Sequence, residues 1–240
     1  MSERWFGIIS IVKRPHVEII FEDTDIIVVD KPAGMIVHPA PGHTSGSLLD
    51  ILLEHAPKMA GVGSDTRPGI VHRLDIETSG VMVLAKTMRA YHALRAAFES
   101  HEAVRKTYLA VVHGALKTRT GTVETLIGRK PWDPHRMAVV EEDGKRAVTH
   151  WNVLQRHGSI SLVEFTIETG RTHQIRVHAA HLGHPVVGDS LYGNAAADRR
   201  LAVRPHRQLL HALGLAFAHP VTGEPMEFMV KPPPDIIYAH

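Results

Sequence analysis

The segment Arg67–Gly80 contains a carboxylate placed where it can do chemistry. Asp75 lies between Leu74 and Ile76, at the end of an apolar stretch and just before a Thr-Ser-Gly turn. A carboxylate in such surroundings is partly desolvated unless a cation or hydrogen bonds compensate it. The same residue also fits a structural role, in which its side chain caps the turn by accepting bonds from nearby backbone N–H groups. Taken by themselves, the residues favour the capping role.

A second polar cluster lies in residues 168–178. There, Arg171, His173 and Arg176 surround the expected start of a helix that Thr172 is predicted to cap. Backbone N–H groups point outward at a helix N-terminus and favour anions. The cluster is therefore expected to bind a phosphate or a buried carboxylate, and the alternative is a polar helix start exposed to solvent.

The chain has 19 histidines and no cysteine. The absence of cysteine excludes disulfides, thiolate nucleophiles and cysteine zinc sites. Four histidines lie close together around the predicted helix: His173, His178, His181 and His184. Successive side chains on a helix are about 100° apart, so His178 and His181 are neighbours while the other two point to the opposite side. No three of the four converge on one ion, and no metal site is expected.

Other chemistries lack their signatures. There is no Gly-x-Ser-x-Gly elbow, P-loop or Gly-x-Gly-x-x-Gly fingerprint, so neither a serine hydrolase nor a nucleotide cofactor is indicated. Tyr108, after Arg105 and Lys106, is either a core residue of a strand or a stacking platform beside a basic rim. The basic stretch 199–207 is expected to be a solvated loop, with phosphate contact as the alternative. The residues thus indicate a cationic, aspartate-centred site without a cofactor.

Strands dominate the elements that must position these residues. Apolar runs predict strands at Val17–Phe21, Ile26–Val29, Val81–Ala85, Val104–Val112, Thr122–Ile127, Val148–Leu154, Ile160–Ile167, Leu213–Phe217 and Met226–Val230. Helices are predicted around Leu48–Leu53, after a Thr87 cap, and after Thr172. This order favours one α+β domain with a largely antiparallel sheet.

Length and charge fit a single domain of ordinary composition. The 240 residues carry a formal net charge of +2, so local basic patches matter more for partners than the total charge. Residues 1–16 are expected to form an N-terminal arm and residues 17–240 the catalytic domain. No apolar run reaches the roughly 18 residues of a membrane helix, so no membrane association is expected.

The ordered motifs of this chain resemble those of the RluA family of pseudouridine synthases. The clearest is His72-Arg73-Leu74-Asp75 followed by Thr78-Ser79-Gly80. The matching segments are Glu22–Gly34 with His38-Pro39, Arg67–Lys86, Lys106-Thr107-Tyr108, Thr169–Gly193, Leu209–Ala212 and His219-Pro220. They span about residues 17–235 in order, which makes the resemblance far more specific than one short motif.

The resemblance implies the pseudouridine synthase fold, a bent and mostly antiparallel mixed sheet with flanking helices and a central catalytic cleft. It implies isomerisation of uridine to pseudouridine in RNA, without metal or cofactor. Asp75 matches the catalytic aspartate, Tyr108 the tyrosine that stacks on the target base, and Arg176 the basic residue that pairs with the aspartate. Arg73 matches the arginine that occupies the gap left by the flipped nucleotide.

The chain departs from the family pattern in places. Ile76 and Glu77 stand where many members have Lys and Asp, which is expected to alter RNA contacts. The S4-like domain of some relatives is expected to be absent. The motifs are most similar to the branch that modifies large-subunit ribosomal RNA, with transfer RNA as the alternative. A cytoplasmic monomer is expected. A non-catalytic RNA-binding or ribosome-assembly protein and a nucleobase hydrolase are the competing functions.

Overall fold

Strands far apart in the sequence join into one bent sheet. The computed structural model describes residues 17–40, 45–100, 103–130 and 132–237. The strands of the main sheet are β1 (Glu18–Glu22), β2 (Ile26–Lys31), β5 (Ser79–Ala85), β6 (Val104–His113), β7 (Thr120–Lys130), β8 (Asp133–Val140), β9 (Lys145–His157), β10 (Ile160–Ile167), β11 (Leu210–Ala218) and β12 (Pro225–Met229). The other elements are β3 (Gly63–Ser64), β4 (Arg67–Pro68), α1 (Leu48–His55), α2 (Met88–Ser100), α3 (Gln174–His181), α4 (Ala195–Asp198), α5 (Pro234–Ile237) and a 3-10 turn at Pro57–Gly61.

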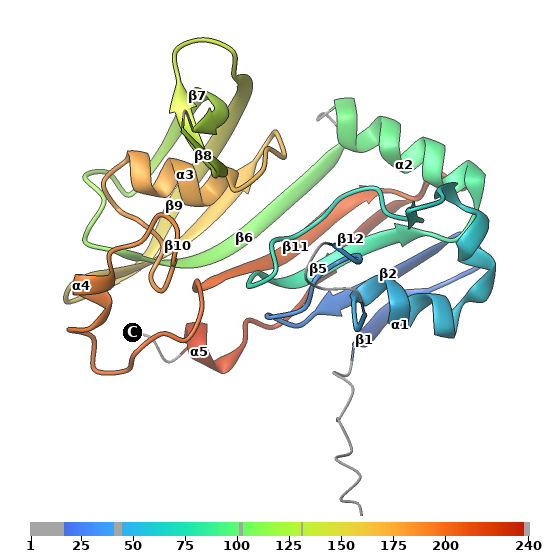
Figure 1. Cartoon of the computed structure of the whole chain (residues 1–240), viewed down its shortest axis with the longest axis horizontal. Coiled ribbons are helices and arrows are strands. Elements are labelled where there is room, and N and C mark those ends of the chain that lie inside the picture. Colours follow the sequence, from blue (N-terminus) through green and yellow to red (C-terminus); the bar gives the residue numbers. More distant parts are fainter. Residues whose placement is uncertain (1–16, 41–44, 101–102, 131, 238–240) are drawn as a thin grey trace, which may run out of the picture.

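The 10-stranded sheet has the order β1-β2-β5-β11-β6-β10-β9-β7-β8, with β12 paired to β11. Its pairings are antiparallel except for β5 with β11, which run parallel. In Figure 1 β1, β2 and β5 spread to the right beside α1 and α2, whereas β7 to β10 rise on the left beside α3. The predicted α+β class and mostly antiparallel mixed sheet are confirmed.

Local chemistry explains the first hairpin and helices. In the turn between β1 and β2, the Asp23 carboxylate accepts the N–H groups of Asp25 and Ile26, both at 2.8 Å. Ser47 and Asp50 form a reciprocal capping box at the start of α1. Thr87 accepts the N–H of Ala90 at 3.2 Å, so the predicted cap of α2 is confirmed.

The centre of the sheet aligns the segments that carry the candidate residues. Tyr108 on β6 is in register with Phe165 on β10 and with Ala212 on β11. Ala212 in turn faces Gly80 at the start of β5. Gly80 has φ of +120°, and a Cβ there would collide with the Ala212 carbonyl. This close approach places the loop that ends in β5 beside Tyr108.

The short elements β3, β4, α4, α5 and the 3-10 turn were not predicted, and two larger differences concern β8 and the start of α3. Strand β8 was not predicted, because Pro134 and polar neighbours interrupt the apolar alternation; pairing with β7 extends this edge segment. The prediction that Thr172 caps the next helix is wrong. Helix α3 begins at Gln174 after His173, whose φ of 56° is left-handed, and no side chain caps it. The expected arm at residues 1–16 lies outside the described residues.

No helix among the described residues is long and apolar enough to cross a membrane.

Candidate active site

Asp75 lies in the loop between β4 and β5, and its carboxylate turns away from that loop. The backbone closes the turn by a bond from Thr78 N–H to the Asp75 carbonyl at 3.1 Å. The Asp75 Oδ2 instead accepts a bond from Arg176 Nη1 at 2.8 Å. The predicted ion pair is therefore confirmed, and the alternative of a turn-capping side chain is wrong. The Asp75 side chain keeps 22% of its surface exposed, so it is still reachable from the pocket.

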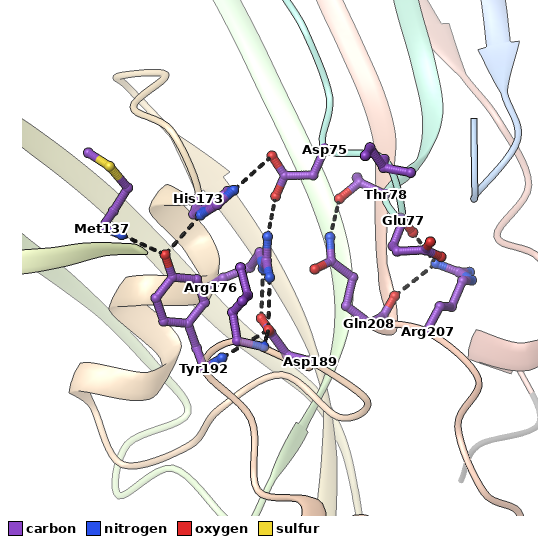
Figure 2. Close-up of polar contacts among 12 residues, drawn as sticks. Asp75, Glu77, Thr78, Met137, His173, Arg176, Asp189, Tyr192, Arg207 and Gln208 are labelled. Carbon is purple, nitrogen blue, oxygen red and sulfur yellow. Dashed lines mark hydrogen bonds and ion pairs between the residues drawn. The ribbon is translucent and has the colours of Figure 1, made fainter. Parts of the chain in front are cut away.

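Arg176 holds two carboxylates with one guanidinium (Figure 2). Its Nε and Nη2 donate to Asp189 at 2.6 and 2.8 Å, which leaves Nη1 for Asp75. The Asp189 side chain is fully buried, and Arg176 keeps only 6% of its side-chain surface. A planar guanidinium fixed by a two-point contact has a defined orientation. Asp189 therefore fixes the direction from which Arg176 meets Asp75.

His173 faces the other oxygen of the Asp75 carboxylate. Its Nε2 lies 3.8 Å from Asp75 Oδ1, beyond hydrogen-bond distance. Its Nδ1 lies 2.8 Å from the Tyr192 hydroxyl, which also accepts the Met137 N–H of β8 at 2.8 Å. Burial lowers the pKa of His173, partly opposed by the charge of Asp75. Oδ2 is thus committed to Arg176, whereas Oδ1 has no direct partner at hydrogen-bond distance among the described residues.

Side-chain hydrogen bonds from other segments fix the three residues that follow Asp75. The Ile76 carbonyl accepts a bond from Lys31 Nζ at 3.0 Å, and the Glu77 carbonyl accepts one from Arg207 Nη1 at 3.0 Å. The Thr78 hydroxyl accepts a bond from Gln208 Nε2 at 2.7 Å, as Figure 2 shows. The loop that carries Asp75 is therefore fixed by side chains from β2 and from the segment before β11.

Tyr108 and Arg73 complete the pocket in front of the carboxylate. The pocket is lined by Arg73, Leu74, Asp75, Thr78, Tyr108, Ile167, Gly170, Arg171, His173, Gln174, Ile175, Arg176 and Leu210. Arg73 is exposed, and no ion pair joins it to Glu77 among the residues that the structure describes. Burial raises the pKa of Tyr108, and the charge of Asp75 raises it further. Its hydroxyl is therefore protonated, and the tyrosine offers a neutral ring to the pocket.

The polar cluster around Arg171 resolves into a carboxylate site. A phosphate or a buried carboxylate was expected as its ligand, and Arg176 binds the carboxylates of Asp75 and Asp189. Arg171 lines the pocket, and its Nε donates to the Arg146 carbonyl at 2.9 Å. The nearby histidines have separate partners: His178 lies between Thr125 and Thr149, and His184 is next to the His113 carbonyl. Among the described residues no group of three or more potential ligands is arranged for a metal.

Sequence reasoning missed four supporting residues, namely Lys31, Asp189, Tyr192 and Arg207. Asp189 and Tyr192 occur in a motif-bearing segment, but nothing local marks their contacts. The expectation of a solvated loop at 199–207 is wrong for Arg207, which is 9% exposed and pairs with Asp235 at 2.7 Å. Its position next to a buried segment, before β11, is the only signal that the sequence carries.

Residues 25–181 match the family model for RNA pseudouridylate synthase. This match covers more than half of the chain. The chain belongs to the RNA pseudouridylate synthase family. The predicted resemblance to its RluA branch is confirmed by relatives called ribosomal large subunit pseudouridine synthase D.

One such relative, from Neisseria meningitidis, is 46% identical over 92% of this chain and 59% of its own length. An uncharacterized RNA pseudouridine synthase of Synechocystis is 47% identical over 86% of this chain and 63% of its own length. The chain thus spans roughly three fifths of the length of these relatives. The solved structure of human RNA pseudouridylate synthase domain containing 1 is similar, with a TM-score of 0.72, 29% identity, and coverage of 90% of this chain and 83% of that one.

Proposed function

We propose that this protein isomerises uridine to pseudouridine in RNA, with Asp75 as the catalytic carboxylate and large-subunit ribosomal RNA as the substrate. One observation carries the proposal. Asp75 lines a pocket together with Tyr108 while Arg176 holds Oδ2 at 2.8 Å, and Oδ1 has no partner at hydrogen-bond distance among the described residues. The relatives called large subunit pseudouridine synthase D support the ribosomal target, and transfer RNA is the alternative target.

The reaction is balanced without an external reactant. The N1–C1′ bond breaks, the uracil rotates, a C5–C1′ bond forms, C5 loses its proton and N1 gains one. Cleavage of the glycosidic bond builds positive charge on the sugar, which a carboxylate stabilises or traps. Asp75 acts either by attacking the sugar or by removing a sugar proton. In both cases the guanidinium of Arg176 holds the carboxylate in place through its bond to Oδ2.

Binding requires the target base to leave its stack. Extrusion costs a few kcal/mol and is partly offset by stacking in the pocket. In this proposal the Tyr108 ring supplies that stacking surface. Arg73 is exposed at the rim and carries a planar cation suited to the vacated base position and to phosphate. The protein is proposed to act in the cytoplasm as a monomer.

The deciding experiment measures tritium release from RNA that contains 5-³H-uridine. The wild-type protein should release tritium, and Asp75→Asn should not, because an amide is neither a nucleophile nor a base. The variant should keep its melting temperature, since Arg176 retains its two bonds to Asp189. Asp65→Asn, an exposed loop variant, is the control and should retain activity.

Product analysis and RNA-binding measurements alongside this assay separate the competing functions. Turnover by pure Asp75→Asn protein would refute the catalytic assignment. Free uracil without pseudouridine would indicate a hydrolase, and RNA binding without either product would indicate a non-catalytic protein. Mapping pseudouridines in cells with and without the protein identifies the target. Loss of a transfer RNA pseudouridine instead of a ribosomal one would refute the ribosomal proposal.

A further inference from the structure

Lys106 on β6 is a buried cation with little to compensate its charge. The residue is 6% exposed, and its ammonium donates to the Glu168 carbonyl at 3.2 Å. Among the described residues no carboxylate forms an ion pair with it. An ammonium has three donors, and buried charges in proteins are normally paired and fully hydrogen-bonded. The ammonium also lies 6.0 Å from the centroid of the Phe98 ring, but among the described residues it has no second oxygen acceptor at hydrogen-bond distance.

Lys31 shows how the same fold compensates a buried lysine. Its ammonium donates to three carbonyls, those of Pro32, Met35 and Ile76, at 2.9 to 3.0 Å. Burial lowers the pKa of Lys31 to about 7, partly opposed by the carboxylates of Glu77 and Asp75. Burial lowers the pKa of Lys106 to about 8, and there the nearby charge is that of Arg171, which lowers it further. Lys106 thus has one carbonyl acceptor where Lys31 has three, and it lacks the acidic surroundings of Lys31.

Lys106 lines a pocket that adjoins the candidate active site. Residues two apart on a strand share a face, so Lys106 and Tyr108 point the same way from β6. The two pockets share the walls Arg73, Tyr108, Ile167, Gly170 and Arg171. The adjoining pocket adds Val71, His72, Phe98, Glu99 and Lys106. Tyr108 thus stands between the pocket of Asp75 and the pocket of Lys106.

The adjoining pocket is cationic and has an apolar wall. Three cations line it, namely Lys106, Arg73 and Arg171. The lining has one carboxylate, that of Glu99, and this carboxylate pairs with Arg95 at 2.5 Å. Its wall includes Phe98, whose ring stacks on the His72 ring with centroids 4.5 Å apart. Burial lowers the pKa of His72 to about 3, so this ring is neutral, and its Nε2 accepts the Val83 N–H. A ligand that carries an anionic group for the cations and an apolar surface for the Phe98 wall fits this pocket.

We propose that this pocket is a phosphodiester subsite for a nucleotide next to the target uridine, with Lys106 as the residue that contacts its phosphate. The inference rests on the proposed function, because an RNA strand whose target base enters the pocket of Asp75 must lead its neighbouring nucleotide past Tyr108. The phosphate oxygens supply the acceptors that Lys106 lacks. The base or sugar of that nucleotide lies against Phe98.

The first test measures binding of a single-stranded oligoadenylate with one central uridine as a function of salt. Lys106→Met removes the charge at nearly constant shape. One lost phosphate contact should reduce the slope of log K against log salt by about 0.7 for single-stranded RNA. Arg105→Gln is the matched control on the opposite face of β6, where Arg105 is exposed and pairs with Glu227 at 2.5 Å. The control should keep the wild-type slope, as should Lys106→Arg.

Stability distinguishes binding from a structural role. Lys106→Met removes an incompletely paired buried charge from the free protein, so its melting temperature should equal or exceed that of the wild type. A melting temperature several degrees lower, with an unchanged salt slope, would overturn the inference. Lys106→Arg keeps the cation and supplies the comparison if the methionine variant does not fold; a reduced slope in a folded arginine variant would also count against it.

The second test neutralises single phosphates with methylphosphonate linkages on either side of the uridine. One linkage should weaken binding to the wild type several-fold and have no effect on binding to Lys106→Met. Equal losses in both proteins at every linkage would overturn the subsite. Binding does not require turnover, so the two proposals fail separately. If one methylphosphonate linkage weakens binding only when Lys106 is present, but the protein releases no tritium, the isomerase proposal alone is refuted. If the protein releases tritium but no linkage has such an effect, the subsite proposal alone is refuted.

Discussion

Asp189→Asn should destabilise the protein although Asp189 does not reach the pocket. The wild-type carboxylate accepts Arg176 Nε and Nη2 at 2.6 and 2.8 Å, together with the N–H groups of Leu191 and Tyr192 at 2.9 and 3.0 Å. An asparagine places an NH₂ group against one guanidinium N–H, so a donor meets a donor. The variant also leaves Arg176 with the more exposed Asp75 as its sole carboxylate partner.

The expected loss follows from the burial of this pair. Breaking a fully buried ion pair costs about 3–5 kcal/mol, and the remaining bond to Asp75 favours the lower end of that range. For a protein of this size each kcal/mol shifts the melting temperature by about 2–4 °C. A loss of roughly 3 kcal/mol therefore predicts a melting temperature that is about 6–12 °C lower. The single-turnover rate should fall as well, because Arg176 no longer has a fixed orientation towards Asp75.

The pH dependence of this loss provides a second readout. Burial alone would raise the pKa of Asp189, but the hydrogen bonds and charge of Arg176 lower it on balance below the ordinary 3.8. A lowered folded-state pKa contributes stability above the unfolded-state value, and this contribution is lost as pH falls through the folded-state value. The difference between wild type and variant should therefore be constant near neutral pH and should narrow below about pH 4.

Urea unfolding at neutral and acidic pH measures both effects, with Asp65→Asn as the exposed control. The midpoint of Asp189→Asn should fall with little change in the slope m, which would show that stability and not compactness has changed. A variant within about 0.5 kcal/mol of the wild type, the range of ordinary surface changes, would refute the argument. So would a difference that grows as the pH falls.

Further predictions concern Arg73, metal removal and Lys31. Arg73→Ala should leave the melting temperature nearly unchanged and should slow single turnover more on a paired target uridine than on an unpaired one. Arg73→Lys should restore part of the rate. A large stability loss with equal rate defects on both substrates would contradict this prediction. EDTA should not reduce tritium release, and rescue by one specific divalent ion on an RNA with unchanged fold would contradict that expectation. Lys31→Met removes the lysine donor from three carbonyls, of which that of Ile76 keeps the Gly34 N–H at 2.9 Å. At about 1–3 kcal/mol for each of the two carbonyls that lose their donor, the variant should lower the urea midpoint, opposite to Lys106→Met.

The sequence determines those parts of this protein that depend on neighbours along the chain. Apolar runs predicted strands β1, β2 and β5, and Thr87 predicted the start of α2, because burial periodicity and capping are local properties. Motif resemblance indicated Asp75, Tyr108 and Arg176. Each of these residues lies within a short sequence motif, and a motif can be recognised without a structure.

Only the tertiary structure determines which distant groups meet. Arg176 and Asp75 are separated by 101 positions, and Arg207 and the Glu77 carbonyl by 130. The Thr172 cap was predicted from a residue type that suits caps, yet Tyr192 bonds His173 in the left-handed turn where α3 begins. Edge strand β8 depends on pairing with β7 rather than on its own pattern. The contrast between Lys31 and Lys106 has the same origin, because the cost of a buried charge depends on acceptors that the fold brings from elsewhere.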